Sequence, residues 1–268
     1  METQFIEVLN ELTPISLEEV KGIKLMRRID RKYLTKTDDL LELLRRLKSS
    51  YSIQESDGVM VFKYMTLYFD TPELSLFKRH HNGSLTRDKI RLRWYCESGC
   101  SYFEIKQKDN RGYTTKKRVK IPDGFDSSRE IVTAFKESDS IVEDFLIKNS
   151  FLKQDQIDRC IKTRFRRITL IDKIRSERVT IDFDIEFENM KTGKSFSLRD
   201  LVVIETKQDS RRVSAIKDFL MEMRIKETGF SKYCIGSILT DNTLKKNLFK
   251  MKLMEIDKLT HYKNGIIY

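Results

Sequence analysis

Apolar and polar residues alternate with a period of two between residues 86 and 121, a pattern typical of β-strands with one buried face. The alternation predicts three strands, at 86–96, 101–108 and 113–121, with short turns between them. Short turns join antiparallel neighbours, because parallel strands need long crossovers. The same period predicts further strands at 25–35, 59–69, 160–171, 178–187 and 195–207.

Four longer segments carry the helical period instead. Residues 14–21 open with Ser16 and Glu19 at capping-box spacing, and residues 40–47 carry a leucine stripe after Thr37. The segments 127–149 and 210–226 complete the set, and Pro72 begins a short helix. We therefore predict an α+β fold in one domain over residues 1–268, with an N-terminal helical segment at 1–22 and a C-terminal tail at 240–268.

The polar faces of the predicted strands are unusually basic. In the strand at 86–96, arginine and lysine dominate one face, while Ile90, Leu92 and Trp94 take the other. The basic residues on such faces are Arg28, Lys32, Arg87, Lys89, Arg91, Arg93, Lys106, Lys108, Lys116, Arg118, Lys162, Arg164, Arg166 and Lys207.

Two arrangements fit these basic faces. A single strand of this kind is more often the solvated outer face of a sheet. Like charges on neighbouring strands repel, however, unless an anion is drawn between them. Because many strands share the feature, we predict a closed antiparallel β-barrel or tunnel with a charged interior and helices packed outside. Such an interior suits polyphosphate, since arginine and lysine both bind phosphate oxygens.

Carboxylates within the basic faces need a reason of their own. Glu104, Asp182, Asp184 and Glu205 are candidate ligands for a hard divalent cation, Mg²⁺ or Mn²⁺, that would bridge phosphate oxygens. For any one of them, neutralising a neighbouring arginine is at least as good an explanation.

Composition narrows the function classes. The chain has 52 Lys and Arg against 41 Asp and Glu, a net charge of +11, so a polyanionic partner is expected. A hydrophobic content of 39% excludes wholesale disorder. No apolar stretch approaches the roughly 20 residues that cross a bilayer, and the first residues do not resemble a secretion signal. We therefore expect a cytoplasmic protein without a transmembrane segment, with its four cysteines reduced.

Five short motifs occur in an order that resembles a known family. They are 28–33 (RIDRKY), 90–93 (IRLR), 103–106 (FEIK), 203–207 (VIETK) and 230–233 (FSKY). Together they resemble the polyphosphate polymerase domain of the vacuolar transporter chaperone (VTC) complex, within the triphosphate tunnel metalloenzymes. The likeness covers roughly residues 23–237, and the order and combination make it specific.

The resemblance implies an enzyme that moves the γ-phosphoryl group of ATP onto a growing inorganic polyphosphate chain and releases ADP, assisted by a divalent metal. By similarity, the phosphate-contacting catalytic residues are Lys32, Arg91, Arg93, Lys106, Lys116, Arg164, Arg166 and Lys232. Further substrate contacts are expected at Arg28, Lys89, Lys108, Arg118, Lys162, Lys207 and Ser231, and Glu205 is the expected metal carboxylate.

Two other functions stay open. The tunnel enzymes that hydrolyse small triphosphates usually begin with E-x-E-x-K, where this chain has Arg28, Asp30 and Lys32. That difference favours the polymerase, although an inorganic or nucleoside triphosphatase would use the same site. A nucleic-acid or polyphosphate binding protein without catalysis is the second alternative, but the aromatic residues near the basic strands do not share one face. No P-loop or Rossmann fingerprint is present, and the sequence does not indicate the oligomeric state.

Overall fold

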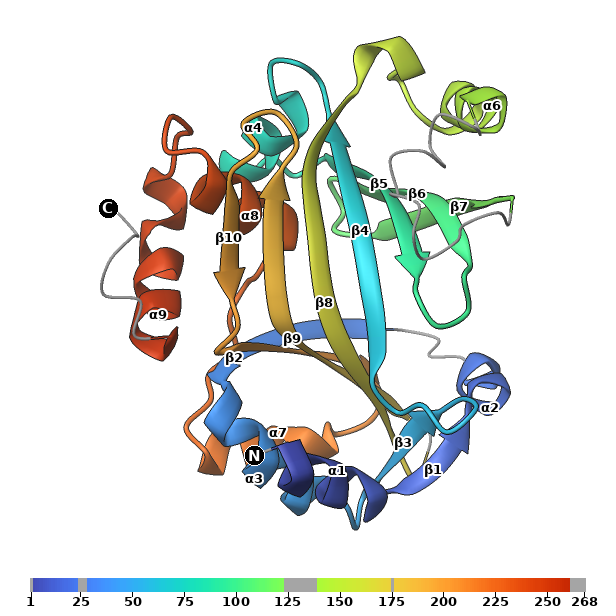
Figure 1. Cartoon of the computed structure of the whole chain (residues 1–268), viewed down its shortest axis with the longest axis vertical. Coiled ribbons are helices and arrows are strands. Elements are labelled where there is room, and N and C mark those ends of the chain that lie inside the picture. Colours follow the sequence, from blue (N-terminus) through green and yellow to red (C-terminus); the bar gives the residue numbers. More distant parts are fainter. Residues whose placement is uncertain (1, 24–27, 123–138, 175, 261–268) are drawn as a thin grey trace.

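The computed structural model describes residues 2–23, 28–122, 139–174 and 176–260 (Figure 1). The strands are β1 (Thr13–Ser16), β2 (Arg28–Lys36), β3 (Tyr51–Glu55), β4 (Phe62–Asp70), β5 (Arg87–Tyr95), β6 (Ser101–Lys108), β7 (Thr114–Ile121), β8 (Asp158–Asp172), β9 (Glu177–Asn189), β10 (Ser195–Leu198) and β11 (Leu201–Asp209). The helices are α1 (Glu2–Asn10), α2 (Leu17–Gly22), α3 (Thr37–Leu47), α4 (Ser75–His81), α6 (Asp139–Asn149), α7 (Ala215–Glu222), α8 (Lys232–Thr240) and α9 (Lys250–Thr260), with 3₁₀ turns η1 (Gln154–Gln156) and η2 (Asn247–Phe249).

One sheet organises the chain. Its main path runs β2-β11-β9-β8-β4-β5-β6-β7, and every neighbouring pair on this path is antiparallel. The predicted antiparallel α+β fold is therefore confirmed. The sheet is strongly curved but not closed, since β2 and β7 end the path and no described pairing joins them. A curved open sheet thus takes the place of the predicted closed barrel.

Most of the predicted elements are present, with several differences. The predicted helix at 14–21 begins only at Leu17, after β1, and β3 is a strand that the residue pattern does not predict. The expected strand at 195–207 is two strands, β10 and β11, because residues 199–200 turn between them. The predicted tail contains α9, and the unpredicted α8 lies just before it. The predicted helix at 127–149 is observed as α6 from residue 139 onward, and its earlier part lies outside the described residues.

Helices cover the sheet on both faces. On the outer face, α1, α3 and α7 pack against apolar residues such as Ile181 and Ile204, and α6 packs against β5 and β6. On the inner, concave face, α8 packs against Phe165 and Phe187. An added Cβ at Gly236 would lie 2.5 Å from the Phe187 ring, so glycine is required for this close approach of α8 to β9. The inner face is therefore apolar beneath α8 and charged beyond it.

A bulge in β9 corrects the alternation predicted for that strand. The register between β8 and β9 shifts near Asp184, whose φ of 50° lies in the left-handed region. Before the bulge, Ile181 and Phe183 face the outer helices; after it, Ile185 and Phe187 face α8 inside. Each half of the strand thus buries its apolar side. The expected shared face from Asp182 to Glu188 is consequently split: Asp182 points inward and its acidic neighbours point outward.

Candidate active site

The concave face holds a cavity of about 1610 Å³ that is open to solvent on one side. Its walls come from the ends of β2, β5, β6 and β11, from the β6–β7 turn and from residues 227–231. Predicted site residues that line it are Lys32, Lys89, Lys106, Lys108, Glu205 and Ser231. A regular antiparallel register places side chains of paired residues on the same face, so Lys89 and Lys106 lie opposite each other, as do Arg87 and Lys108.

Glu104 on β6 anchors the first ionic cluster. It lies opposite Arg91 of β5, next to the Lys89–Lys106 pair along the inner face. Arg91 Nη2 lies 2.7 Å from Glu104 Oε2, and Lys116 pairs with Oε1. Burial would raise the pKa of Glu104, but Arg91, Arg93 and Lys116 together lower it to about 2. Burial lowers the pKa of Lys116 to about 8 despite this partner. Glu104 is therefore a fixed anion that orients cations from β5 and β7.

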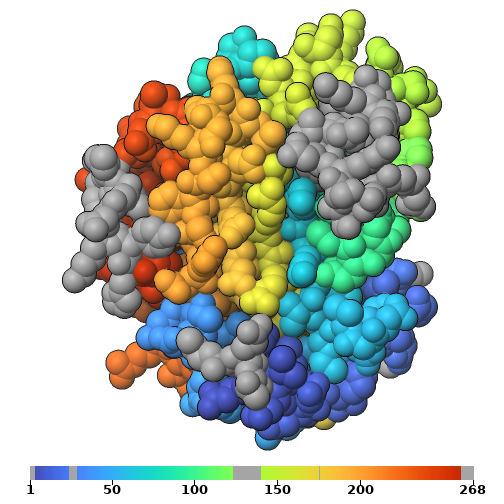
Figure 2. Space-filling view, viewed as in Figure 1, coloured from blue at the N-terminus to red at the C-terminus, as the bar shows by residue number. Residues whose placement is uncertain are grey.

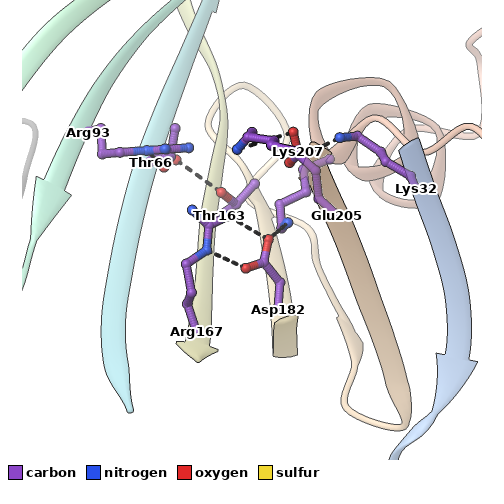
Figure 3. Close-up of polar contacts among 9 residues, drawn as sticks. Lys32, Thr66, Arg93, Thr163, Arg167, Asp182, Glu205 and Lys207 are labelled. Carbon is purple, nitrogen blue, oxygen red and sulfur yellow. Dashed lines mark hydrogen bonds and ion pairs between the residues drawn. The ribbon is translucent and has the colours of Figure 1, made fainter. Parts of the chain in front are cut away.

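Asp182 anchors the second cluster. Arg167 Nε lies 2.5 Å from Asp182 Oδ1 and Nη2 lies 2.8 Å from Oδ2, and Lys232 at the start of α8 also pairs with Oδ2 (Figure 3). Burial would raise the pKa of Asp182, but Arg167 and Lys232 hold it well below its usual range. Lys232 also lies over the Phe165 ring, with Nζ 4.4 Å from the ring centroid. This cluster fixes the N-terminal end of α8 against β8 and β9.

Glu205 anchors the third cluster, at the cavity wall. Lys32 Nζ on β2 is 3.0 Å from Oε2 and Lys207 Nζ is 3.3 Å from Oε1 (Figure 3). Burial would raise the pKa of Glu205, but Lys207 and Lys32 hold it well below its usual value. Both carboxylate oxygens therefore already have a cationic partner.

Lys89, Arg93 and Lys106 are among the inner-face cations that have no carboxylate partner within ion-pair distance in the described part of the chain. Arg93 is 8% exposed, and its Nε donates only to Thr66 Oγ1 at 3.3 Å. Burial and the neighbouring Arg91 lower the pKa of Arg93. Lys89 donates to Ser231 Oγ at 3.2 Å, and burial lowers its pKa to about 8. Burial also lowers the pKa of Lys106, although Glu205 opposes the shift. These unpaired charges are costly unless an anion enters.

Three further predicted site residues are Arg118, Ser231 and Arg28. The register places Arg118 opposite Glu104, and its guanidinium lies 4.5 Å from the centre of the Tyr102 ring. Ser231 is the N-cap of α8 and accepts from the Cys234 N–H. Arg28 begins β2, and its side chain lies outside the described part of the chain.

Four predicted site residues lie elsewhere, on the outer face: Lys162, Arg164, Arg166 and Asp184. Lys162 and Arg164 pair with Glu188, at 2.7 and 3.3 Å, and Arg166 pairs with Asp184. Figure 2 shows the side of the molecule where β8 and β9 reach the surface. The difference has a simple cause: α8 covers Ile161 and Phe165 on the inner face of β8, so the residues that alternate with them, Lys162, Arg164 and Arg166, face out. Arg164 is exposed and Arg166 is partly exposed to solvent, as the alternative interpretation expects, whereas Lys162 is buried beside Glu188.

Arg167 belongs to the site and was not predicted. It shares the inner face with Thr163 and Phe165, on the opposite side of β8 from Lys162, Arg164 and Arg166. The adjacent pair Arg166 and Arg167 was the available signal, because one of two consecutive residues in a strand must face inward.

The carboxylates do not form a ready-made metal cage. No group of three His, Cys, Asp or Glu side chains with metal-binding geometry occurs in the described ranges. Glu104, Asp182 and Glu205 each lie between two cations in separate clusters. Mg²⁺ often uses one or two carboxylates together with substrate phosphates, so a single carboxylate fits only a cation that arrives with a phosphate ligand.

Comparison with solved structures finds proteins of similar fold. A Hippeastrum protein with a reported dominant triphosphatase activity matches with a TM-score of 0.50 and 16% identity, covering 78% of this chain and 94% of that one. A Pyrococcus horikoshii protein matches with a TM-score of 0.42 and 11% identity, covering 77% and 97%. Comparison with curated proteins finds no match. At these identities the likeness is one of fold alone.

The model of the VTC domain family matches residues 27–240. This range spans most of the chain, so the protein belongs to the VTC domain family, as its motifs predicted. Among the described helices, none has both the length and the apolar character that crossing a bilayer demands.

Proposed function

We propose that this protein is a triphosphate-processing enzyme that transfers the γ-phosphoryl group of ATP to the end of an inorganic polyphosphate chain. Membership of the VTC domain family and the tunnel-type fold support triphosphate processing. The observation that carries the proposal is the set of cations on the inner face. Lys89 and Lys106 line the cavity, Arg93 follows Lys89 on the same face of β5, and none of the three has a carboxylate partner among the described residues.

The reaction needs alignment and charge neutralisation more than covalent participation by the protein. An oxygen of the terminal phosphate attacks the γ-phosphorus of ATP, the bond from that phosphorus to the β,γ-bridging oxygen breaks, and ADP leaves with the electron pair. No protein nucleophile is required. In the proposal, Arg91 and Arg93 stabilise the negative charge that builds on the transferred group. Glu104 keeps Arg91 in place for this task.

The size of the cavity suits two phosphate ligands. Sites for small molecules usually enclose about 300–1,000 Å³. The cavity here has about 1610 Å³, enough for a nucleotide and the end of an acceptor chain together. In the proposal, Lys106 and Lys89 from β6 and β5 face Lys32 from β2 across this space, so that phosphates are held from more than one wall.

A divalent cation, Mg²⁺ or Mn²⁺, enters this proposal as part of the substrate, bound to the triphosphate. Glu205 is the inner-face carboxylate that would reach it from the cavity wall. The cation would neutralise phosphate charge. Lys32 and Lys207 keep Glu205 ionised and ready to accept it. Asp182, with Arg167 and Lys232 on its oxygens, is proposed as a structural anion.

A test follows from the stoichiometry. The purified protein is incubated with ATP and Mn²⁺, and ADP, orthophosphate and acid-labile phosphate polymer are quantified. The proposal predicts ADP and polymer-bound phosphate in equal amounts. If no polymer forms and the protein binds oligonucleotides tightly without turnover, the proposal is contradicted. That result would favour the nucleic-acid binding alternative.

Hydrolysis is the second candidate function, favoured by the fold likeness to the Hippeastrum protein with reported triphosphatase activity. Water would take the place of the acceptor phosphate in the same cavity. Orthophosphate released in the same amount as ADP, with no polymer, would establish this alternative.

A further inference from the structure

The cavity wall carries an aromatic surface that phosphate binding does not explain. His80, at the end of α4, and Phe249, in η2, both line the cavity. Their ring centroids are 6.2 Å apart and their planes differ by 23°. Leu248, beside Phe249, also lines the cavity and is 67% exposed. Phosphate groups do not use an aromatic face, so the His80–Phe249 ring pair suits a ligand that also has a flat, uncharged part.

Burial and the surrounding cations both favour the neutral form of the His80 imidazole. Burial lowers its pKa to about 3, and Lys89, Arg87 and Lys108 oppose its protonation further. Its Nδ1 atom is buried and has no hydrogen-bond partner in the described structure. His80 therefore supplies a flat uncharged ring, and it does not act as a phosphate-binding cation.

The aromatic surface lies at one end of a row of cations. His80 adjoins Arg87 and Lys108, which are directly opposite each other and line the cavity. From Arg87, the inner-face residues Lys89, Arg91 and Arg93 follow along β5. At about 3.3 Å per residue, this row extends roughly 20 Å. A ligand with a flat neutral end and a linear polyanionic tail matches that arrangement.

We propose that His80, Phe249 and Leu248 form a nucleobase subsite, on which the base of the donor nucleotide stacks while its triphosphate extends inward along β5. The inference rests on the proposed function, which supplies a nucleoside triphosphate as donor. Stacking on an aromatic ring tolerates every base, because each base has a π-face. The subsite therefore selects nucleoside triphosphates over inorganic triphosphates and discriminates weakly between ATP and GTP.

The test compares two ligands that share the triphosphate and differ in the base. Dissociation constants of a β,γ-imido analogue of ATP and of inorganic tripolyphosphate are measured by calorimetry for the parent, for Phe249→Leu and for His80→Ala. Phe249→Leu keeps an apolar side chain in the partly buried position but removes the ring. Phe151→Leu is the matched control, because Phe151 is 97% exposed and does not line the cavity.

The parent is expected to bind the nucleotide analogue more tightly than tripolyphosphate. Phe249→Leu and His80→Ala should each weaken binding of the analogue about tenfold, which corresponds to about 1.4 kcal/mol, and leave tripolyphosphate affinity within twofold. The control variant should change neither. Since both ligands bind to the same protein preparation, a folding defect would weaken both and is recognised at once.

Several outcomes would overturn the inference. An equal change in the affinity for both ligands, or no change in either, assigns the ring pair to packing alone. A parent that binds tripolyphosphate as tightly as the analogue has no base subsite, although the proposed phosphate cavity would stand. A parent that binds neither ligand refutes both the subsite and the proposed function.

Discussion

Arg167 holds both carboxylate oxygens of Asp182, and the inner face of the sheet is arranged around pairs of this kind. The Nε–Oδ1 distance is 2.5 Å and the Nη2–Oδ2 distance is 2.8 Å, the bidentate geometry in which arginine binds carboxylates best. Asp182 is 3% exposed. A buried ion pair of this type contributes little when intact, but removing one partner leaves uncompensated charge.

Asp182→Asn should therefore destabilise the fold. The change leaves Arg167 and Lys232 buried beside a neutral amide, and we expect the free energy of unfolding to fall by about 3–5 kcal/mol. Urea denaturation measures the change. The matched control is Asp184→Asn on the outer face, where a half-exposed pair with Arg166 should contribute no more than about 1 kcal/mol. Equal losses in the two variants would contradict this difference.

The same carboxylate gives a pH dependence of stability. The folded-state pKa of Asp182 lies well below its unfolded value, which is about 3.9. Its stabilising contribution is therefore fully present above that unfolded pKa and is lost as the pH falls through the folded pKa. The parent should lose more stability between neutral pH and pH 3 than Asp182→Asn does. Parallel stability curves would count against the assignment.

Arg93→Ala should abolish most turnover without unfolding the protein. Arg93 has no carboxylate partner in the described chain, and burial together with Arg91 already disfavours its charge, so its removal relieves repulsion. Loss of one charge-stabilising donor typically lowers kcat by about 10²–10³-fold. Arg164→Ala, on the outer face of β8, is the control and should change kcat less than twofold. An Arg93→Ala protein with full activity and parental thermal stability would remove Arg93 from the proposed site.

The variant Glu205→Gln distinguishes the effect of this carboxylate on metal binding from its effect on phosphate binding. The amide no longer attracts a divalent cation, but it leaves Lys32 and Lys207 free to bind phosphate. We expect weaker Mn²⁺ activation, with tripolyphosphate affinity unchanged or higher. Glu186→Gln is the control, because Glu186 pairs with Arg199 on the outer face. An unaltered Mn²⁺ titration in Glu205→Gln would show that this carboxylate does not contact the metal.

Triphosphate affinity should fall as the pH rises through about 8. Burial lowers the pKa of Lys89, Lys116 and Lys232 to about 8 each, so these lysines lose their charge well below the usual lysine range. Each lysine that must be protonated weakens binding up to about tenfold per pH unit above its pKa. Tripolyphosphate dissociation constants between pH 7 and 10 measure the effect.

Lys89→Arg provides the matched comparison for this pH profile. Arginine stays protonated throughout the range, so the variant should show a shallower profile than the parent. Identical profiles would exclude Lys89 from the phosphate site.

The sequence predicted the site best where one strand face is uniformly charged. On β5 and β6 the alternation placed Arg91, Arg93 and Glu104 together, and the register agrees. On β8 the alternation pointed to the basic residues Lys162, Arg164 and Arg166, which face outward. The inner face of β8 is apolar where α8 covers it. That cover is a tertiary contact, and no local pattern in β8 reveals it.

The bulge at Asp184 could not be predicted from the sequence either. Aspartate tolerates a positive φ better than most residues do, but it does so at few of its positions in proteins, so the sequence gives no usable signal. That the sheet does not close was likewise not predictable from the sequence. Whether β2 pairs with β7 depends on the curvature of the whole sheet, which residue alternation does not specify.

A crystal structure with inorganic tripolyphosphate tests the central claim most directly, because it shows which face of the sheet binds phosphate. We predict phosphate oxygens within hydrogen-bond distance of Arg93, Lys106 and Lys32, inside the concave face. Tripolyphosphate bound instead along Arg164 and Arg166 on the outer face, or an empty cavity at saturating ligand, would contradict the account.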